Sequence, residues 1–108
     1  MKLIEEIGEP ATLELLAEEC IELSHAALKL ARVERGENPS PVKQLEAVQK
    51  LLIEMADTQI AISEICQCDW FSSDFVTDTR EFKRNRMEKR INDSKRRVNV
   101  HITDAAQN

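Results

Sequence analysis

Two pairs of acidic residues in the chain have the spacing of metal ligands. Glu19 and Glu22 are three residues apart, and so are Glu54 and Asp57. On a helix this spacing places both carboxylates of a pair on one face, a turn apart. Carboxylate oxygens suit Mg²⁺ or Mn²⁺, whereas zinc and copper sites favour histidine or thiolate ligands. This pattern predicts a site for Mg²⁺, with Mn²⁺ as the alternative ion, held by Glu19, Glu22, Glu54 and Asp57. Acidic residues on solvated helix faces would show the same spacing.

Three basic residues late in the chain have the spacing of a phosphate-binding face. Lys83, Arg86 and Arg90 lie at offsets of three and seven, which places them on one side of a helix. An ammonium group is a point charge for phosphate oxygens, and a guanidinium group is a forked donor to them. We expect this face to bind phosphate if it lies opposite the carboxylate-held cation. A solvated basic surface would show the same pattern.

Apolar residues at steps of three and four predict two long helices that carry the acidic pairs. The first is expected over residues 11–35, with an apolar stripe that runs from Leu13 to Leu30. The second is expected over residues 41–66. Its inward stripe is predicted to consist of Leu45, Val48, Leu52, Met55, Ile62 and Cys66. Between the helices, residues 36–42 contain a glycine and two prolines, which end helices, and an antiparallel hairpin through this turn would bring the acidic pairs face to face.

A third helix is predicted to carry the basic residues. It should run over residues 75–93 and be capped by one residue of the run Ser72, Ser73 and Asp74. Residues 94–108 are expected to form a tail, in which residues 98–102 would be at most a short edge strand. The aromatic residues before the cap, Trp70 and Phe71, either anchor the preceding loop in the core or stack on a nucleobase.

Length and composition restrict the class of protein. A chain of 108 residues, 42% of them hydrophobic, can form one ordinary core, so we predict a single domain over residues 1–108. Two glycines, three prolines and no tyrosine indicate a soluble, helix-rich chain, and the predicted fold class is all-α, a bundle of three to four main helices. The irregular spacing of three cysteines predicts reduced thiols. No signal segment or long apolar run is apparent, so we expect a cytoplasmic protein without a membrane partner.

Charge is distributed unevenly along the chain. The formal net charge of −5 argues against simple electrostatic binding to nucleic acid or anionic lipid. Residues 1–79 contain 16 acids and 6 bases, whereas residues 80–97 contain 3 acids and 9 bases. An acidic body could hold cations and a basic late segment could hold phosphates, although solvated helix faces would give the same counts.

Three stretches, EECIEL at 18–23, LLIEMAD at 51–57 and FKRNRMEKR at 82–90, occur in this order on the three predicted helices. In this combination the chain resembles the MazG-type all-alpha nucleoside triphosphate pyrophosphohydrolases. The resemblance implies Mg²⁺-dependent cleavage of a nucleoside or deoxynucleoside triphosphate to a nucleoside monophosphate and pyrophosphate. It also implies a homodimer or homotetramer, because a short chain completes its helical bundle with a neighbour. By the same resemblance the residues that hold the metal and act in catalysis are Glu19, Glu22, Glu54 and Asp57, and those that contact the triphosphate are Lys83, Arg86 and Arg90.

The alternative is a protein of another class, a non-enzymatic oligomeric helical module. In such a module the acidic pairs and the basic helix would be complementary surfaces that determine how subunits pair. The two hypotheses predict different effects of added Mg²⁺ and nucleotide on thermal stability. An enzyme site of this kind should be stabilised by the two ligands together, and a pairing surface should not.

Overall fold

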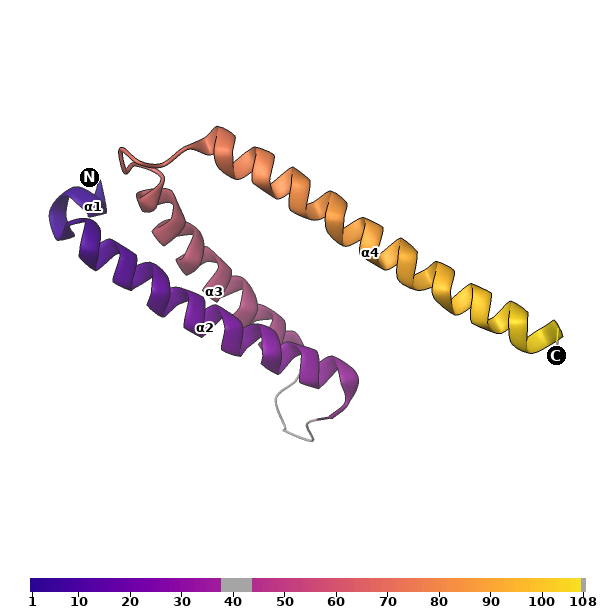
Figure 1. The fold of residues 1–108 in the computed structure, drawn as a ribbon. Helices are drawn as coiled ribbons and strands as arrows, with labels where there is room; N and C mark the ends of the chain where they lie inside the picture. Colours follow the sequence, from indigo (N-terminus) through magenta and orange to yellow (C-terminus); the bar gives the residue numbers. More distant parts are fainter. Residues whose placement is uncertain (38–43, 108) are drawn as a thin grey trace. The chain divides into compact units, whose positions relative to one another are not determined.

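The described chain is all-helical, which confirms the all-α part of the predicted fold class. The computed structural model describes residues 1–37 and 44–107, with the backbone alone for 101 and 103–107. These ranges form four helices and no strand: α1 (Leu3–Ile7), α2 (Glu9–Arg35), α3 (Gln44–Ile65) and α4 (Ser73–Gln107) (Figure 1). They divide into two units, Met1–Phe71 and Ser72–Asn108, and each is described below by itself. None of the described helices combines the length and the apolar character needed to cross a membrane.

Two glycines with positive φ separate and end the first helices. Gly8, with a φ of 88°, lies between α1 and α2, and its N–H donates to the carbonyl of Ile4 at 2.9 Å. Gly36, with a φ of 68°, is the C-cap of α2. Residues with a Cβ rarely adopt such φ values, so glycine is the residue suited to both positions. The sequence predicted neither the short α1 nor the start of α2 at Glu9, two residues earlier than expected.

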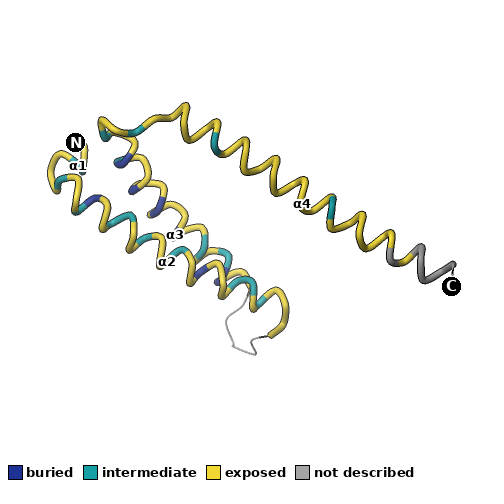
Figure 2. Tube along the Cα trace, viewed as in Figure 1, coloured by how far each residue is buried: buried dark blue, intermediate teal, exposed yellow. Residues whose placement is uncertain are grey.

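Helices α2 and α3 pack against each other through small and polar side chains. Within the described residues, the buried side chains are Thr12 and Ala26 on α2 and Ala47, Glu54, Thr58, Ala61 and Ile65 on α3 (Figure 2). Alanines at such positions let two helix backbones approach closely. The two helices form the predicted hairpin, while residues 38–43 of the connecting turn, including the expected start of the second helix, lie outside the described residues.

The predicted inward stripe of the second helix is wrong. Leu45, Leu52 and Ile62 are 65%, 57% and 47% exposed, and the buried face of α3 is the neighbouring one that contains Ala47, Glu54 and Ala61. Both faces are partly apolar. The large apolar residues predicted the wrong face of α3. Helix α2 packs against the neighbouring face because its small side chains let the two helices approach more closely. Large apolar side chains are thereby left on the surface of this unit.

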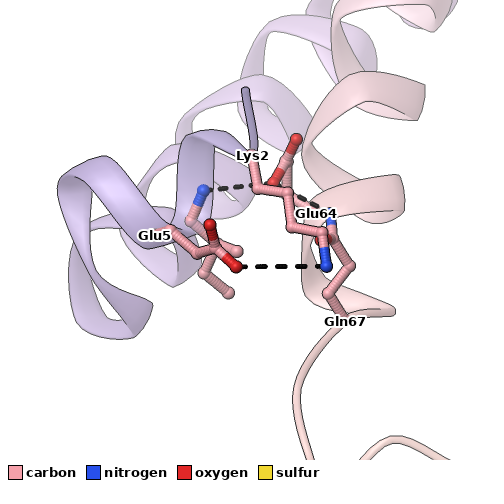
Figure 3. A network of polar contacts seen from close by, with 5 residues as sticks. Lys2, Glu5, Glu64 and Gln67 are labelled. Atoms are coloured by element: carbon pink, nitrogen blue, oxygen red, sulfur yellow. Dashed lines mark hydrogen bonds and ion pairs between the residues drawn. The ribbon is translucent and has the colours of Figure 1, made fainter.

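Side-chain hydrogen bonds tie the ends of the first unit together. The Glu64 carboxylate accepts hydrogen bonds from the Ile4 backbone N–H at 3.1 Å and from the Gln67 side-chain amide at 3.0 Å, next to the Lys2–Glu5 ion pair (Figure 3). This arrangement fixes α1 to the C-terminal turn of α3. The three cysteines of the chain are free, with Cys20 and Cys66 exposed and Cys68 half-buried.

Helix α4 is much longer than predicted. Its N-terminal cap is Ser72, whose Oγ accepts the Phe75 N–H at 3.1 Å, so the expected capping is confirmed. The helix continues to Gln107, and the tail or edge strand expected over residues 94–108 is wrong for 94–107. No glycine or proline occurs between Ser73 and Gln107, so nothing in the sequence ends the helix earlier.

Candidate functional site

Three of the four predicted metal ligands meet where α2 and α3 pack. Glu19 projects from α2, and Glu54 and Asp57 project from α3 a turn apart; one carboxylate oxygen from each lies within 4.8 Å of the others. We call these three residues the acidic cluster. Glu54 is only 5% exposed, Glu19 is half-buried and Asp57 is exposed. The cluster therefore has one side in the helix interface and one side open to solvent.

Glu22, the fourth predicted ligand, lies outside this close group. It is exposed on α2, one turn after Glu19. Its negative charge nevertheless acts on the site, because it contributes to raising the pKa of both Glu19 and Lys50. The role of Glu22 as a metal ligand stays a prediction.

Thr58 aligns the two helices at the level of the acidic cluster, and sequence reasoning missed it. Its hydroxyl donates to the Glu54 carbonyl at 2.8 Å and also approaches the Glu19 carbonyl, at 3.4 Å. The side chain is 5% exposed, so a hydroxyl without these acceptors would be costly there. The bond to Glu54 lies within α3, whereas the longer contact with the Glu19 carbonyl crosses from α3 to α2.

Electrostatic repulsion within the acidic cluster is substantial. Partial burial raises the pKa of the Glu19 carboxyl above its ordinary value, and the negative charges of Asp57, Glu54, Glu22 and Glu18 raise it further. The arrangement therefore favours a bound positive charge.

One positive charge already lies at the cluster. The Lys50 ammonium is 2.7 Å from a carboxylate oxygen of Glu54, one turn away on α3. Its hydrogen bond to Glu54 and its attraction to that carboxylate raise the pKa of Lys50, and Glu22 and Asp57 raise it further, although partial burial opposes them. The spacing of four residues between Lys50 and Glu54 was a signal in the sequence for this pair.

The predicted phosphate-binding residues lie together on α4. Lys83, Arg86 and Arg90 are all exposed, and in the described part of the chain none of them forms an ion pair. Arg84, on another side of this helix, pairs with Glu88 at 3.4 Å. The three residues thus present their charges to solvent within their own unit. Their approach to the acidic cluster stays a prediction.

The two aromatic residues before α4 differ in their surroundings. The indole N–H of Trp70 donates to a Glu9 carboxylate oxygen at 2.7 Å, while the side chain remains 58% exposed. Phe71 is half-buried. The Trp70 contact ties the loop after α3 to the start of α2 at the surface, so the predicted anchoring in the core is not found for Trp70. Contact with a nucleobase stays a prediction.

Comparisons of the chain with models of protein families, with curated proteins and with solved structures found no match. We therefore infer the chemistry of the site from its own residues. Three carboxylates from two helices can hold one Mg²⁺, an ion that usually keeps several waters and binds through a few carboxylates plus substrate phosphates. The open side of the acidic cluster leaves room for such ligands.

The raised pKa of Glu19 predicts how stability changes with pH in the absence of divalent ions. An acid whose pKa is raised by folding holds its proton more tightly in the folded state, so stability falls as pH rises through that pKa. Glu19→Gln should therefore raise the melting temperature at neutral pH in EDTA. It should also reduce the gain in stability that the wild type shows on mild acidification.

Thermal melts of wild type and Glu19→Gln in EDTA, at neutral and mildly acidic pH, test this expectation. Glu14→Gln is the matched control, because Glu14 is an exposed glutamate of α2 outside the acidic cluster. A melting temperature of Glu19→Gln equal to or below that of the wild type at neutral pH would show that the charged Glu19 carboxylate does not destabilise the folded protein.

Proposed function

We propose that the protein is a Mg²⁺-dependent nucleoside triphosphate pyrophosphohydrolase. The observation that carries the proposal is the convergence of Glu19, Glu54 and Asp57 from two helices. The order of two acidic motifs and one basic motif, which resembles that of MazG-type enzymes, supports the same reaction. The substrate would be a nucleoside or deoxynucleoside triphosphate, and the products a nucleoside monophosphate and pyrophosphate.

In this proposal each group of residues has its own task. Glu19, Glu54 and Asp57, with Glu22, hold the cation, and Lys83, Arg86 and Arg90 bind and orient the triphosphate. When bound, Mg²⁺ supplies charge neutralisation of phosphoryl oxygens and lowers the pKa of a coordinated water. A carboxylate of the site accepts the proton of the water that attacks the α-phosphorus. The bond from that phosphorus to the bridging oxygen breaks, and pyrophosphate leaves in line.

A substrate panel tests the proposed reaction directly. Purified protein is incubated with Mg²⁺ and each of the common and deoxy nucleoside triphosphates, including triphosphates of damaged bases, and the products are separated. We expect pyrophosphate and the monophosphate from at least one substrate, and no turnover in EDTA. Release of single phosphate from every substrate, or no release from any, would contradict the proposal.

Exposed apolar residues favour assembly of several copies, and we include a homodimer or homotetramer in the proposal. Leu52, Ile53 and Ile60 on α3 are each more than half exposed, and so are Phe75 and Phe82 on α4. Apolar surfaces of this extent usually mark contacts with other chains. A solution mass from light scattering equal to one chain at all concentrations would contradict this part of the proposal.

The same apolar surfaces also favour the second candidate, a non-enzymatic helical module. Thermal stability separates the two candidates, because a ligand that binds only the folded state raises stability, by about 2.7 kcal/mol at a hundred times its dissociation constant. An enzyme site should be stabilised by several degrees when Mg²⁺ and a non-hydrolysable nucleoside triphosphate are added together. A pairing module should show no joint effect of the two ligands.

A further inference from the structure

Lys50 is the one cation that pairs with the acidic cluster among the residues that the structure describes. Its ammonium contacts Glu54 at 2.7 Å. The two partners differ in burial: the Glu54 side chain is 6% exposed and the Lys50 side chain 57%. The buried carboxylate is thus held in place by the helix interface, whereas the ammonium reaches it from the solvent side on a flexible stem.

This geometry gives Lys50 a function when no divalent ion is bound. A buried carboxylate without a partner is strongly destabilising, and Glu54 in addition faces Glu19 and Asp57 across less than 4.8 Å. One ammonium on Glu54 offsets part of this negative charge. The metal-free protein therefore depends on Lys50 to keep the acidic cluster together.

The same ammonium is in the way of a divalent ion. An ion bound to Glu54 and its neighbours would lie within a few ångströms of the Lys50 ammonium, and cations at that distance repel each other. The exposed stem allows Lys50 to move into solvent without disturbing α3. Displacement therefore needs a change of side-chain rotamer and no change of fold.

We propose that Lys50 is an exchangeable counter-ion, which occupies the cation position on Glu54 in the metal-free protein and is displaced when the divalent ion binds. This inference rests on the proposed metal site, and it adds that the Lys50 ammonium competes with the divalent ion for Glu54. Lys50 lowers the affinity of the acidic cluster for divalent ions. Lys50 also stabilises the protein while the ion is absent.

Calorimetric titration of Mn²⁺ into nucleotide-free protein, together with melts in EDTA, tests the exchange. Lys50→Met removes the charge and keeps the apolar stem, so we expect the Mn²⁺ dissociation constant to fall about tenfold and the melting temperature in EDTA to fall. Lys50→Arg retains the charge and should bind Mn²⁺ no more tightly than the wild type. Lys2→Met is the matched control, because Lys2 belongs to an exposed ion pair with Glu5, and both values should stay unchanged.

Each other outcome overturns the inference in a recognisable way. Equal or weaker Mn²⁺ binding by Lys50→Met would overturn the exchange role and leave the metal site standing. Absence of Mn²⁺ binding by the wild type and by Lys50→Met would overturn both the exchange and the proposed function. If Lys50→Met does not fold, the side-chain NMR signal of Lys50 in the wild type decides: it should move toward that of a solvated lysine on addition of Mg²⁺, and an unchanged signal refutes the exchange.

Discussion

Replacing Asp57 by alanine is expected to abolish pyrophosphate release, with turnover reduced by at least about 100-fold. The carboxylate is exposed and forms part of the acidic cluster, so its removal deprives the cation of a ligand without opening a cavity. Loss of one like charge also leaves the metal-free fold at least as stable. The assay is pyrophosphate release on the best substrate of the panel, with far-ultraviolet circular dichroism as the measure of helix content.

Glu46→Ala is the matched control for this variant. Glu46 is an exposed acid in the first turn of α3 and lies outside the acidic cluster. The turnover of Glu46→Ala should therefore equal that of the wild type. Glu54→Ala should also be inactive, but it removes a buried partner of Lys50 and will be less stable as well. Wild-type turnover in Asp57→Ala would remove the metal assignment.

Enlarging Ala61 is expected to produce the largest loss of stability. Ala61 is completely buried on α3, the helix that packs against α2. Ala61→Leu places three more carbon atoms there, and overpacking of this kind typically lowers the free energy of unfolding by about 1–3 kcal/mol. Because the added bulk pushes α3 away from α2, it should also separate Glu19 from Glu54 and weaken Mn²⁺ binding.

Urea unfolding and Mn²⁺ titration of Ala61→Leu measure both effects. Ala56→Leu provides the same change on the same helix at an exposed position, where a small effect on stability is expected. If Ala61→Leu were as stable as Ala56→Leu, the close contact between α2 and α3 at this position would be refuted. Loss of stability with unchanged Mn²⁺ affinity would show that the cluster does not depend on that contact.

The sequence predicted three long helices and the acidic pairs on the first two, but not α1, the start of α2 or the end of α4. The spacing of apolar residues placed α2 and α3, and the turn residues between them implied a hairpin. From the hairpin and the equal spacing within each acidic pair, we predicted that the pairs face each other, and the structure brings Glu19, Glu54 and Asp57 together. A cap within residues 72–74 was predictable because serine and aspartate are favoured N-cap residues, and the structure selects Ser72 among the three candidates.

The buried face of α3 and the role of Thr58 depend on how the helices pack, and the spacing of apolar residues does not show this. Two neighbouring faces of α3 carry apolar residues, and only the presence of α2 decides that Ala61 is buried and Leu52 is not. The role of Thr58 follows from that choice of face, since its hydroxyl spans the helices only when it points inward. The length of α4 was underestimated because the alternating residues from Val98 to Ile102 were interpreted as a tail or a short edge strand.

The most direct test of the central claim is a crystal structure of the protein with Mn²⁺ and a non-hydrolysable nucleoside triphosphate, with the metal located by anomalous scattering. We predict a peak between the carboxylates of Glu19, Glu54 and Asp57, with the triphosphate bound to it and to Lys83, Arg86 and Arg90, and with Lys50 turned away. A peak elsewhere on the protein, or none at these three carboxylates, would contradict the account.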